Sequence, residues 1–464
     1  MSGTGRWLAA PALALVAVLA WAAGTSALDH KLDITGDVRI RLRHVDSPSP
    51  DTVGLTGTYG EMVKRGFSLK HRLVLEVAYP LTEQVRAGGM LRVSNEGSEV
   101  LQDGPEYLSS EFGSAFIAYE SPILRTRLGY YTTAYTPLTL MRWDTKDDPE
   151  GGSGCGCSGG GGGAGAILSE TLEELGPNLT FEGARFSLTP KGDLGLDGFL
   201  ARPREAGASY QLITYGGRAG YTAYLKSKAA FLDLGLAAIR SEEDEHSVTS
   251  TAGLGRPFKK TVYGVSWKAP LARMASLDGE WTLTSSSGDA TKRGRGGIVA
   301  LNLTPMAAVK FEAAYLYLSP NWDSYFHALS YNPDRQGMRL RLEVERGPVL
   351  VAAFARYLKT IKEAAQPDTA FPTLSLRSRV NLNPALNCAL GAIYSGSGRA
   401  GDGISFGAST KKVTAFGTLT FALAKDSALT LEERYIWNRV DHPTELERDS
   451  EFSMLSLYVK AAIW

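Results

Sequence analysis

Apolar and polar residues alternate along several stretches of the chain. In residues 32–42, LDITGDVRIRL, the apolar side chains share one parity and the charged ones share the other. Residues 66–79, 337–347 and 452–464 show the same alternation. Strict alternation over about ten residues predicts a β-strand with one apolar face and one polar face.

Short turns and long loops also alternate along the chain. The long, hydrophilic loops lie between short links, most of which contain Pro or Gly, and together they predict about twenty antiparallel strands. A pattern of this kind is typical of transmembrane β-barrels, which have short turns at one end and long loops at the other. The nine short links span residues 79–83, 121–125, 189–193, 226–230, 269–273, 304–308, 345–349, 383–387 and 424–428.

The repeated apolar stripe is best explained by a closed sheet in lipid. Lipid offers no hydrogen-bond partners, so a membrane sheet must close on itself and turn its apolar face outward. Tyr79 and Trp267 lie beside short turns, and Tyr317 and Trp437 lie near long loops, as two interfacial girdles require. A soluble β-sandwich would need a second layer over every apolar face. We therefore predict an all-β fold, a transmembrane antiparallel up-and-down β-barrel of about 18–20 strands.

The N-terminus predicts export. Arg6 precedes an apolar run that ends at Thr25-Ser26-Ala27, the pattern of a cleaved secretory signal peptide. We expect a signal peptide over residues 1–27 and the barrel over residues 28–464. No cysteine directly follows the apolar run, so a lipoprotein is not expected. The chain has only 3 cysteines in 464 residues, which excludes a disulfide scaffold.

The chain resembles a Gram-negative outer-membrane porin in its strand pattern and in its terminal aromatic residue, Trp464. The resemblance implies a location in the outer membrane, in contact with outer-membrane lipid and lipopolysaccharide. It also implies folding by the barrel-assembly machinery, and many porins form homo-trimers. One departure concerns the C-terminus, where the apolar stripe ends at Ile463 rather than at the last residue.

Basic residues recur at the parity opposite to the apolar stripe. A barrel of this size encloses water, so these residues are predicted to line a pore and to favour anions mildly. Strands near the two termini are neighbours in a closed barrel, so the late residues Arg434 and Lys460 should join the early ones. The predicted pore-lining residues are Arg39, Arg41, Arg43, Lys70, Arg72, Arg86, Arg92, Arg125, Arg127, Arg339, Arg341, Arg377, Arg379, Arg434 and Lys460.

The longest loop, residues 135–177, is a candidate constriction. By length and position it resembles the loop that folds into the lumen of general porins. Its acidic residues could face the basic wall, or they could be solvated on an external loop. They are Asp144, Asp147, Asp148, Glu150, Glu170, Glu173 and Glu174.

The same loop carries Cys155 and Cys157 inside a glycine run, GSGCGCSGGGGGA. Three interpretations remain open: a strained disulfide, half of a soft-metal site, and two reactive thiols in a flexible tip. A disulfide between them is disfavoured by geometry, and no histidine is near in sequence to complete a metal site. The third cysteine, Cys388, has lipid-facing parity.

Catalysis is not expected, because the chain contains neither Gly-x-Ser-x-Gly nor His-Glu-x-x-His. The short distance between the cleavage site and the first strand argues against a plug domain and so against a TonB-dependent transporter. We predict a water-filled channel for passive diffusion of ions and small hydrophilic solutes, without cofactor or nucleic-acid partner. The alternative is a barrel that sheathes a multihaem cytochrome in an electron-transfer complex. The chain lacks Cys-x-x-Cys-His, so any haem would belong to that partner.

Overall fold

The computed structural model describes most of the chain from residue 32 onward. The described residues are 32–46, 66–94, 109–112, 115–141, 179–191, 193–203, 212–224, 231–242, 259–287, 292–327, 331–361, 369–399, 409–424, 427–441 and 448–463. The predicted signal peptide lies outside them. No helix within these ranges is long and apolar enough to cross a membrane.

The described residues form 21 strand segments in a single sheet. The segments are β1 (Asp33–Asp46), β2 (Gly66–Pro80), β3 (Val85–Ser94), β4 (Ser109–Phe112), β5 (Phe116–Glu120), β6 (Leu124–Thr133), β7 (Leu179–Lys191), β8 (Leu194–Pro203), β9 (Ile213–Tyr224), β10 (Phe231–Glu242), β11 (Lys259–Ala272), β12 (Ala275–Ser287), β13 (Lys292–Met306), β14 (Val309–Leu318), β15 (Arg335–Arg346), β16 (Val349–Thr360), β17 (Thr369–Asn383), β18 (Leu386–Arg399), β19 (Ser409–Ala424), β20 (Ser427–Asp441) and β21 (Arg448–Ile463).

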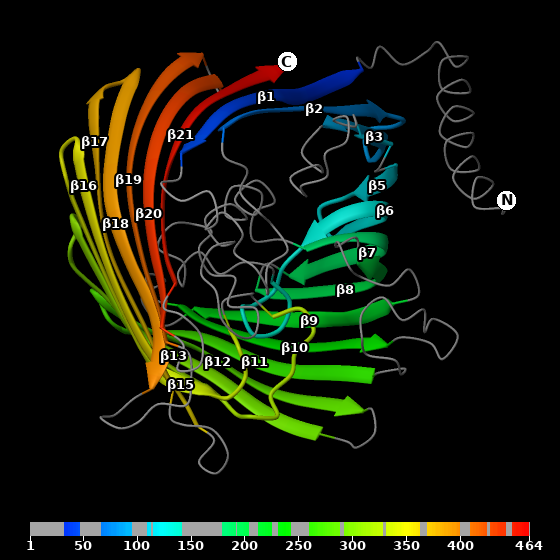
Figure 1. Ribbon diagram of the computed structural model, residues 1–464. Helices are drawn as coiled ribbons and strands as arrows, with labels where there is room; N and C mark the ends of the chain where they lie inside the picture. Colours follow the sequence, from blue (N-terminus) through cyan, green and yellow to red (C-terminus); the bar gives the residue numbers. More distant parts are fainter. Residues whose placement is uncertain are drawn as a thin grey trace, which may run out of the picture.

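The sheet closes into a barrel. Successive strands pair antiparallel along the chain, and β1 pairs with both β2 and β21, which joins the two ends of the sheet. The short segments β4 and β5 pair with the two halves of β3, so they occupy one strand position and the ring has about twenty positions. Figure 1 shows the strands as a ring around a central space. The predicted fold class, with its up-and-down order, is confirmed.

Side-chain exposure alternates along the strands as the sequence pattern predicts. On β15, Met338 is 55% exposed while its neighbour Arg339 is 7% exposed. On β21, Leu455 is 47% exposed and Ser456 is 3% exposed. The outer surface of the barrel is therefore apolar. The opposite parity, called inward below, places polar side chains toward the centre of the ring.

Candidate channel interior

The register brings basic positions from the two ends of the chain together. Arg39 on β1 pairs with Arg72 on β2 and with Lys460 on β21. Arg41 pairs with Lys70 in the next inward row. These five positions have the parity opposite to the exposed outward residues of β1. The closure of the ring, rather than proximity in sequence, makes them one group.

The other predicted pore-lining positions have inward parity as well. Four of them, Arg86, Arg125, Arg377 and Arg379, are exposed on the inner wall. Arg127 is half-buried and its guanidinium lies 3.7 Å above the ring of Phe116. The positions Arg43 and Arg92 follow the same parity on β1 and β3.

Other inward arginines are neutralised by acids on the wall. Arg339 donates to Glu312 Oε1 at 2.7 Å and to the Tyr331 hydroxyl at 3.1 Å, and both members of the ion pair are buried. Arg434 pairs with Glu432 two residues earlier on β20. Arg341 similarly pairs with Glu343 on β15. These pairs add local structure to the wall but little net charge.

The first part of the predicted constriction loop, residues 135–141, packs against the inner wall together with the preceding residue, as the segment 134–141. Glu280 on β12 has inward parity, because its neighbour Trp281 is 41% exposed on the outside. The Thr136 hydroxyl and the Leu138 backbone N–H both donate to the Glu280 carboxylate, the second at 3.2 Å. Leu138 and Leu140 are completely buried. This segment is thus attached to the barrel wall rather than extended away from it.

A second set of polar contacts fixes the start of the same segment. The Tyr135 hydroxyl donates to Asp197 Oδ1 at 2.8 Å. Arg185 forms an ion pair with the other oxygen of Asp197 at 2.8 Å and donates to the Thr132 carbonyl at 3.1 Å. Burial, and next the neighbouring Asp197 carboxylate to which its hydroxyl donates, hold the pKa of Tyr135 well above the usual range for tyrosine. It remains a neutral donor at physiological pH.

The connection after β14, residues 319–327, lies beside the segment 134–141. The Met141 backbone N–H donates to the Phe326 carbonyl at 2.9 Å, and Leu140 and Phe326 form a parallel bridge. The Ser324 hydroxyl donates to the Thr139 carbonyl. Two connections that are far apart in sequence therefore support each other inside the ring (Figure 1).

The connection after β14 is also bound to the wall directly. The Trp322 indole N–H donates to Thr282 at 3.0 Å, and the Asp323 backbone N–H donates to Thr284 at 3.1 Å. The Asp323 carboxylate forms an ion pair with Lys260 on β11 at 2.8 Å. The inward row of β12 thus binds one connection through Glu280 and the other through its threonines.

Glycines on the inner wall make room for these contacts. A Cβ atom on Gly294 would lie 2.3 Å from the backbone of Trp322. A Cβ atom on Gly264 would lie 2.6 Å from the Thr139 side chain. Distances this short require a shift of the neighbour, and a backbone neighbour cannot shift cheaply. Close approach explains glycine at these two inward positions.

On either side of the polar row of β12, the wall beneath the two connections carries apolar side chains on its inner face, which simple alternation does not predict. Two clusters of buried side chains fill the space between wall and connections. One holds Leu140 and Phe326 against residues of β6 to β11, and the other holds Leu138 and Trp322 against residues of β13 to β16. The signal in the sequence is the loss of alternation in residues 296–301, GGIVAL, where both parities are apolar or glycine. Glu280, Thr282 and Thr284 carried no comparable signal.

Several predicted site residues lie outside the described residues. They are the acidic residues Asp144, Asp147, Asp148, Glu150, Glu170, Glu173 and Glu174, together with Cys155 and Cys157. The constriction and the three interpretations of the two cysteines therefore remain predictions. Among the described residues no three His, Cys, Asp or Glu side chains gather as a metal site. Cys388 is a free thiol on β18 and shares the outward parity of Leu390, which is 63% exposed.

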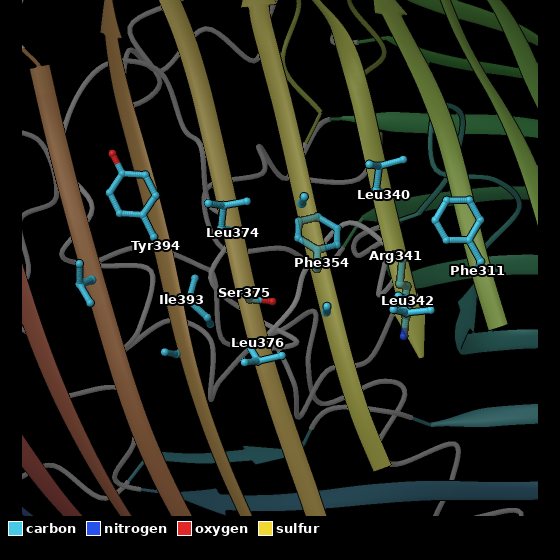
Figure 2. Close-up of a pocket in the computed structure, with 14 residues that line it drawn as sticks. Phe311, Leu340, Arg341, Leu342, Phe354, Leu374, Ser375, Leu376, Ile393 and Tyr394 are labelled. Carbon is cyan, nitrogen blue, oxygen red and sulfur yellow. The ribbon is translucent and has the colours of Figure 1, made fainter. Parts of the chain in front are cut away.

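A groove of about 580 Å³ lies on the outer face of the barrel, not in its interior. Figure 2 shows Leu340 and Leu342 along one side and Leu374 and Leu376 along the other. The strand between them, β16, carries alanine at positions 353 and 355, and these small side chains leave the groove. It belongs to the apolar surface and contributes nothing to the channel.

No protein-family model and no curated protein sequence matches the chain. Solved structures do resemble it. OpdQ of Pseudomonas aeruginosa is 11% identical, with 93% of this chain and 99% of that chain covered and a TM-score of 0.43. OccK3 (OpdO) of the same organism is 13% identical, with 93% and 96% covered and a TM-score of 0.46. A loop L8 deletion mutant of OmpT, an outer membrane protein of Vibrio cholerae, is 10% identical, with 93% and 99% covered and a TM-score of 0.34. Similarity at this level carries no conclusion about a solute.

Proposed function

We propose that this protein is an outer-membrane channel for passive diffusion of ions and small hydrophilic solutes. The observation that carries the proposal is the closed sheet with an apolar outer parity and a charged inner parity. The pairing of β1 with β21 joins the two ends of the sheet, as a sheet in lipid requires. A ring of about twenty strands is also wide enough to hold water, unlike an eight-stranded barrel.

The proposal includes a mild preference for anions. Arg86, Arg125, Arg377 and Arg379 are exposed on the inner wall, and the group around Arg39 adds further basic positions. Inward acids such as Glu76, Glu120 and Glu345 are exposed as well, so the preference is expected to be weak rather than strict. An excess of one sign of charge along a narrow aqueous path raises the local concentration of the opposite ion.

We further propose that the two connections inside the ring narrow the path. Residues 134–141 and 319–327 occupy the inner side of the wall from β6 to β16. The acidic residues that follow in the long loop would then oppose basic residues across a narrowed lumen. In this arrangement the acidic residues of the loop face the basic wall, which is one of the two positions that the sequence leaves open for them.

The test is reconstitution of residues 28–464 into a planar bilayer. The proposal expects stepwise ion conductance from the isolated chain and a reversal potential of anion sign in a salt gradient. Deletion of residues 151–165 should raise the conductance if the long loop narrows the pore. A folded chain that never conducts would overturn the channel. A chain that binds a multihaem cytochrome and conducts no ions would instead support the cytochrome sheath.

A further inference from the structure

Four basic residues gather on the outer face of β10 to β13, at the end of the barrel that carries the long loops, although β12 and β13 are themselves joined there by the short connection 288–291. They are Arg240, Lys259, Arg293 and Arg295, here called the outer basic patch. The four strands are consecutive neighbours in the ring (Figure 1). The patch is thus continuous, although its residues span more than 50 positions of sequence.

The register shows that these side chains point outward. Arg295 pairs with Leu283, which is 50% exposed on the outer surface, and Arg293 pairs with Ser285 one outward position further along. Lys259 pairs with Ser287, and Arg240 pairs with Thr261. Residues two apart on one strand are about 7 Å apart, and alternate strands are about 10 Å apart. The long basic side chains can therefore reach a common ligand.

The charge of the patch is only partly compensated: Glu242 shares its outward face and pairs with Lys259 in the register, whereas Arg293 and Arg295 have no acid opposite them on β12. Glu242 forms an ion pair with Arg240 at 2.9 Å. Within the described part of the chain, no acid lies within ion-pair distance of Lys259, Arg293 or Arg295, and all three are exposed. Two hydroxyls between the cations, those of Ser285 and Thr261, supply further hydrogen-bond donors, whereas the Ser287 hydroxyl donates to the Lys259 carbonyl.

The patch borders the apolar surface directly. Tyr263, two residues beyond Thr261 on β11, is 56% exposed, and Val265 is 44% exposed. On β10, Leu236 is 60% exposed. Moving along these strands from the long loops, the outer face changes from basic side chains and hydroxyls to aromatic and aliphatic ones. A lipid has the same order, with an anionic headgroup above hydrocarbon chains.

We propose that the outer basic patch binds the phosphate groups of lipopolysaccharide in the outer leaflet. The inference rests on the proposed membrane location, in which the long loops face outward from the cell. Guanidinium groups bind phosphate through paired, charge-assisted hydrogen bonds. Each basic side chain near an anionic membrane surface also adds electrostatic attraction. The hydroxyls fit the remaining oxygens of the headgroup.

Elsewhere in the described part of the ring, outward basic residues at the long-loop ends stand singly or beside an acid, as Arg202 on β8 does opposite Glu182. The outward parity at the long-loop ends of β16 and β19 carries one exposed lysine each, Lys359 and Lys411. On β13 itself, the exposed Lys292 has inward parity because it is adjacent to Arg293. These lysines are matched controls, because they carry the same charge as the patch residues but lie outside the patch.

The experiment measures binding of diphosphorylated and dephosphorylated lipid A to the mature chain in detergent by native mass spectrometry. The proposal expects the wild type to prefer the phosphorylated form. The double variant Arg293→Gln/Arg295→Gln should lose affinity for that form by a factor of about ten or more. Arg293→Lys/Arg295→Lys should retain part of the affinity, and Lys292→Gln should behave as the wild type. Inorganic phosphate is included as a competitor to identify sites that accept any free phosphate.

Three outcomes would overturn the proposal: equal binding of both lipids by the wild type, unchanged binding by the double variant, or an equal loss with Lys292→Gln. Complete displacement by millimolar inorganic phosphate would also count against it and would indicate a simple anion site. Heat-modifiable migration on gels confirms that each variant is folded. Conductance in pure phosphatidylcholine bilayers tests the channel separately, because the patch has no part in it.

Discussion

The indole N–H of Trp322 donates a 3.0 Å hydrogen bond to the hydroxyl of Thr282, which lies in the inward row of β12. Trp322 is 1% exposed and Thr282 is completely buried, although they belong to a connection and to a barrel wall. This contact makes the connection after β14 a part of the wall. Its loss should free the connection without opening the sheet.

Gly294→Ala should detach the connection after β14 from the wall. The added methyl group would lie 2.3 Å from the Trp322 backbone, so the backbone must move. We expect faster amide hydrogen exchange in residues 319–327, with exchange in the strands unchanged. Gly195→Ala is the matched control, because nothing lies within 4 Å of a Cβ atom at that inward glycine. Equal exchange in the two variants would contradict the account.

Glu280→Gln should release residues 134–141. Glutamine offers an N–H₂ group where the carboxylate now accepts from Thr136 and from the Leu138 backbone, so at least one donor loses its acceptor. An unsatisfied buried donor costs about 1–3 kcal/mol. Hydrogen exchange at Leu138 is expected to quicken accordingly. Glu345→Gln, at an exposed inward position, should leave that exchange unchanged.

The connection after β14 should loosen as the pH falls below 6.5. Burial lowers the pKa of His327 from its usual value near 6.5, against the opposing effects of the Ser324 carbonyl and Asp323, while Lys260 acts in the same direction as burial. Above pH 6.5 the imidazole is neutral in both the packed and the released connection. Below it, the released form binds a proton first, so the packed form loses stability.

Exchange in residues 319–327, corrected for its intrinsic pH dependence, should therefore rise between pH 7.5 and 5. His327→Gln should remove this rise. A rise that persists in the variant would assign the effect to another group, such as Asp323.

Replacing either of two adjacent glutamates on β20 by glutamine should change the stability of the barrel, and the two changes should have opposite signs. Glu433 shares the outward parity of Leu431 and Tyr435, which are 41% and 40% exposed, so it faces lipid in the middle of a strand. Glu433→Gln should stabilise the barrel in liposomes by about 1 kcal/mol. Glu432→Gln should destabilise it, because Glu432 pairs with the buried Arg434. Urea unfolding of both variants gives the signs, and a common sign would refute the assigned facing.

Reversing the charge of Arg377 and Arg379 should shift ion selectivity toward cations. Both are exposed on the inner wall of β17. The reversal potential of the double Glu variant in a salt gradient should move in the cation direction relative to the wild type. Lys359→Glu, on the outer face, is the control and should leave the potential unchanged. An unchanged potential in the double variant would place the selective region elsewhere in the channel.

The sequence by itself determined the fold and, wherever apolar and polar residues alternate clearly, the facing of the strand. Alternation has a period of two, so an outward Leu or Ile means that the residues on either side of it point inward. Ile40 and Leu42 determine in this way that Arg39, Arg41 and Arg43 face the interior. The alternation of short and long connections then determined the up-and-down order. These are local properties, because a strand's two faces are set by adjacent residues.

Only the tertiary structure decided what fills the inside of the ring. The burial of Leu138 and Trp322 depends on Glu280 and Thr282, which are far away in sequence, and on glycines whose role is simply to be small. Closure of the sheet places Arg39 beside Lys460, as the closed barrel predicted from the sequence requires, whereas the register of β10 to β13 decides which of their basic residues meet in the outer basic patch. Such contacts arise from strand register and from the path of the connections, and no local pattern encodes either.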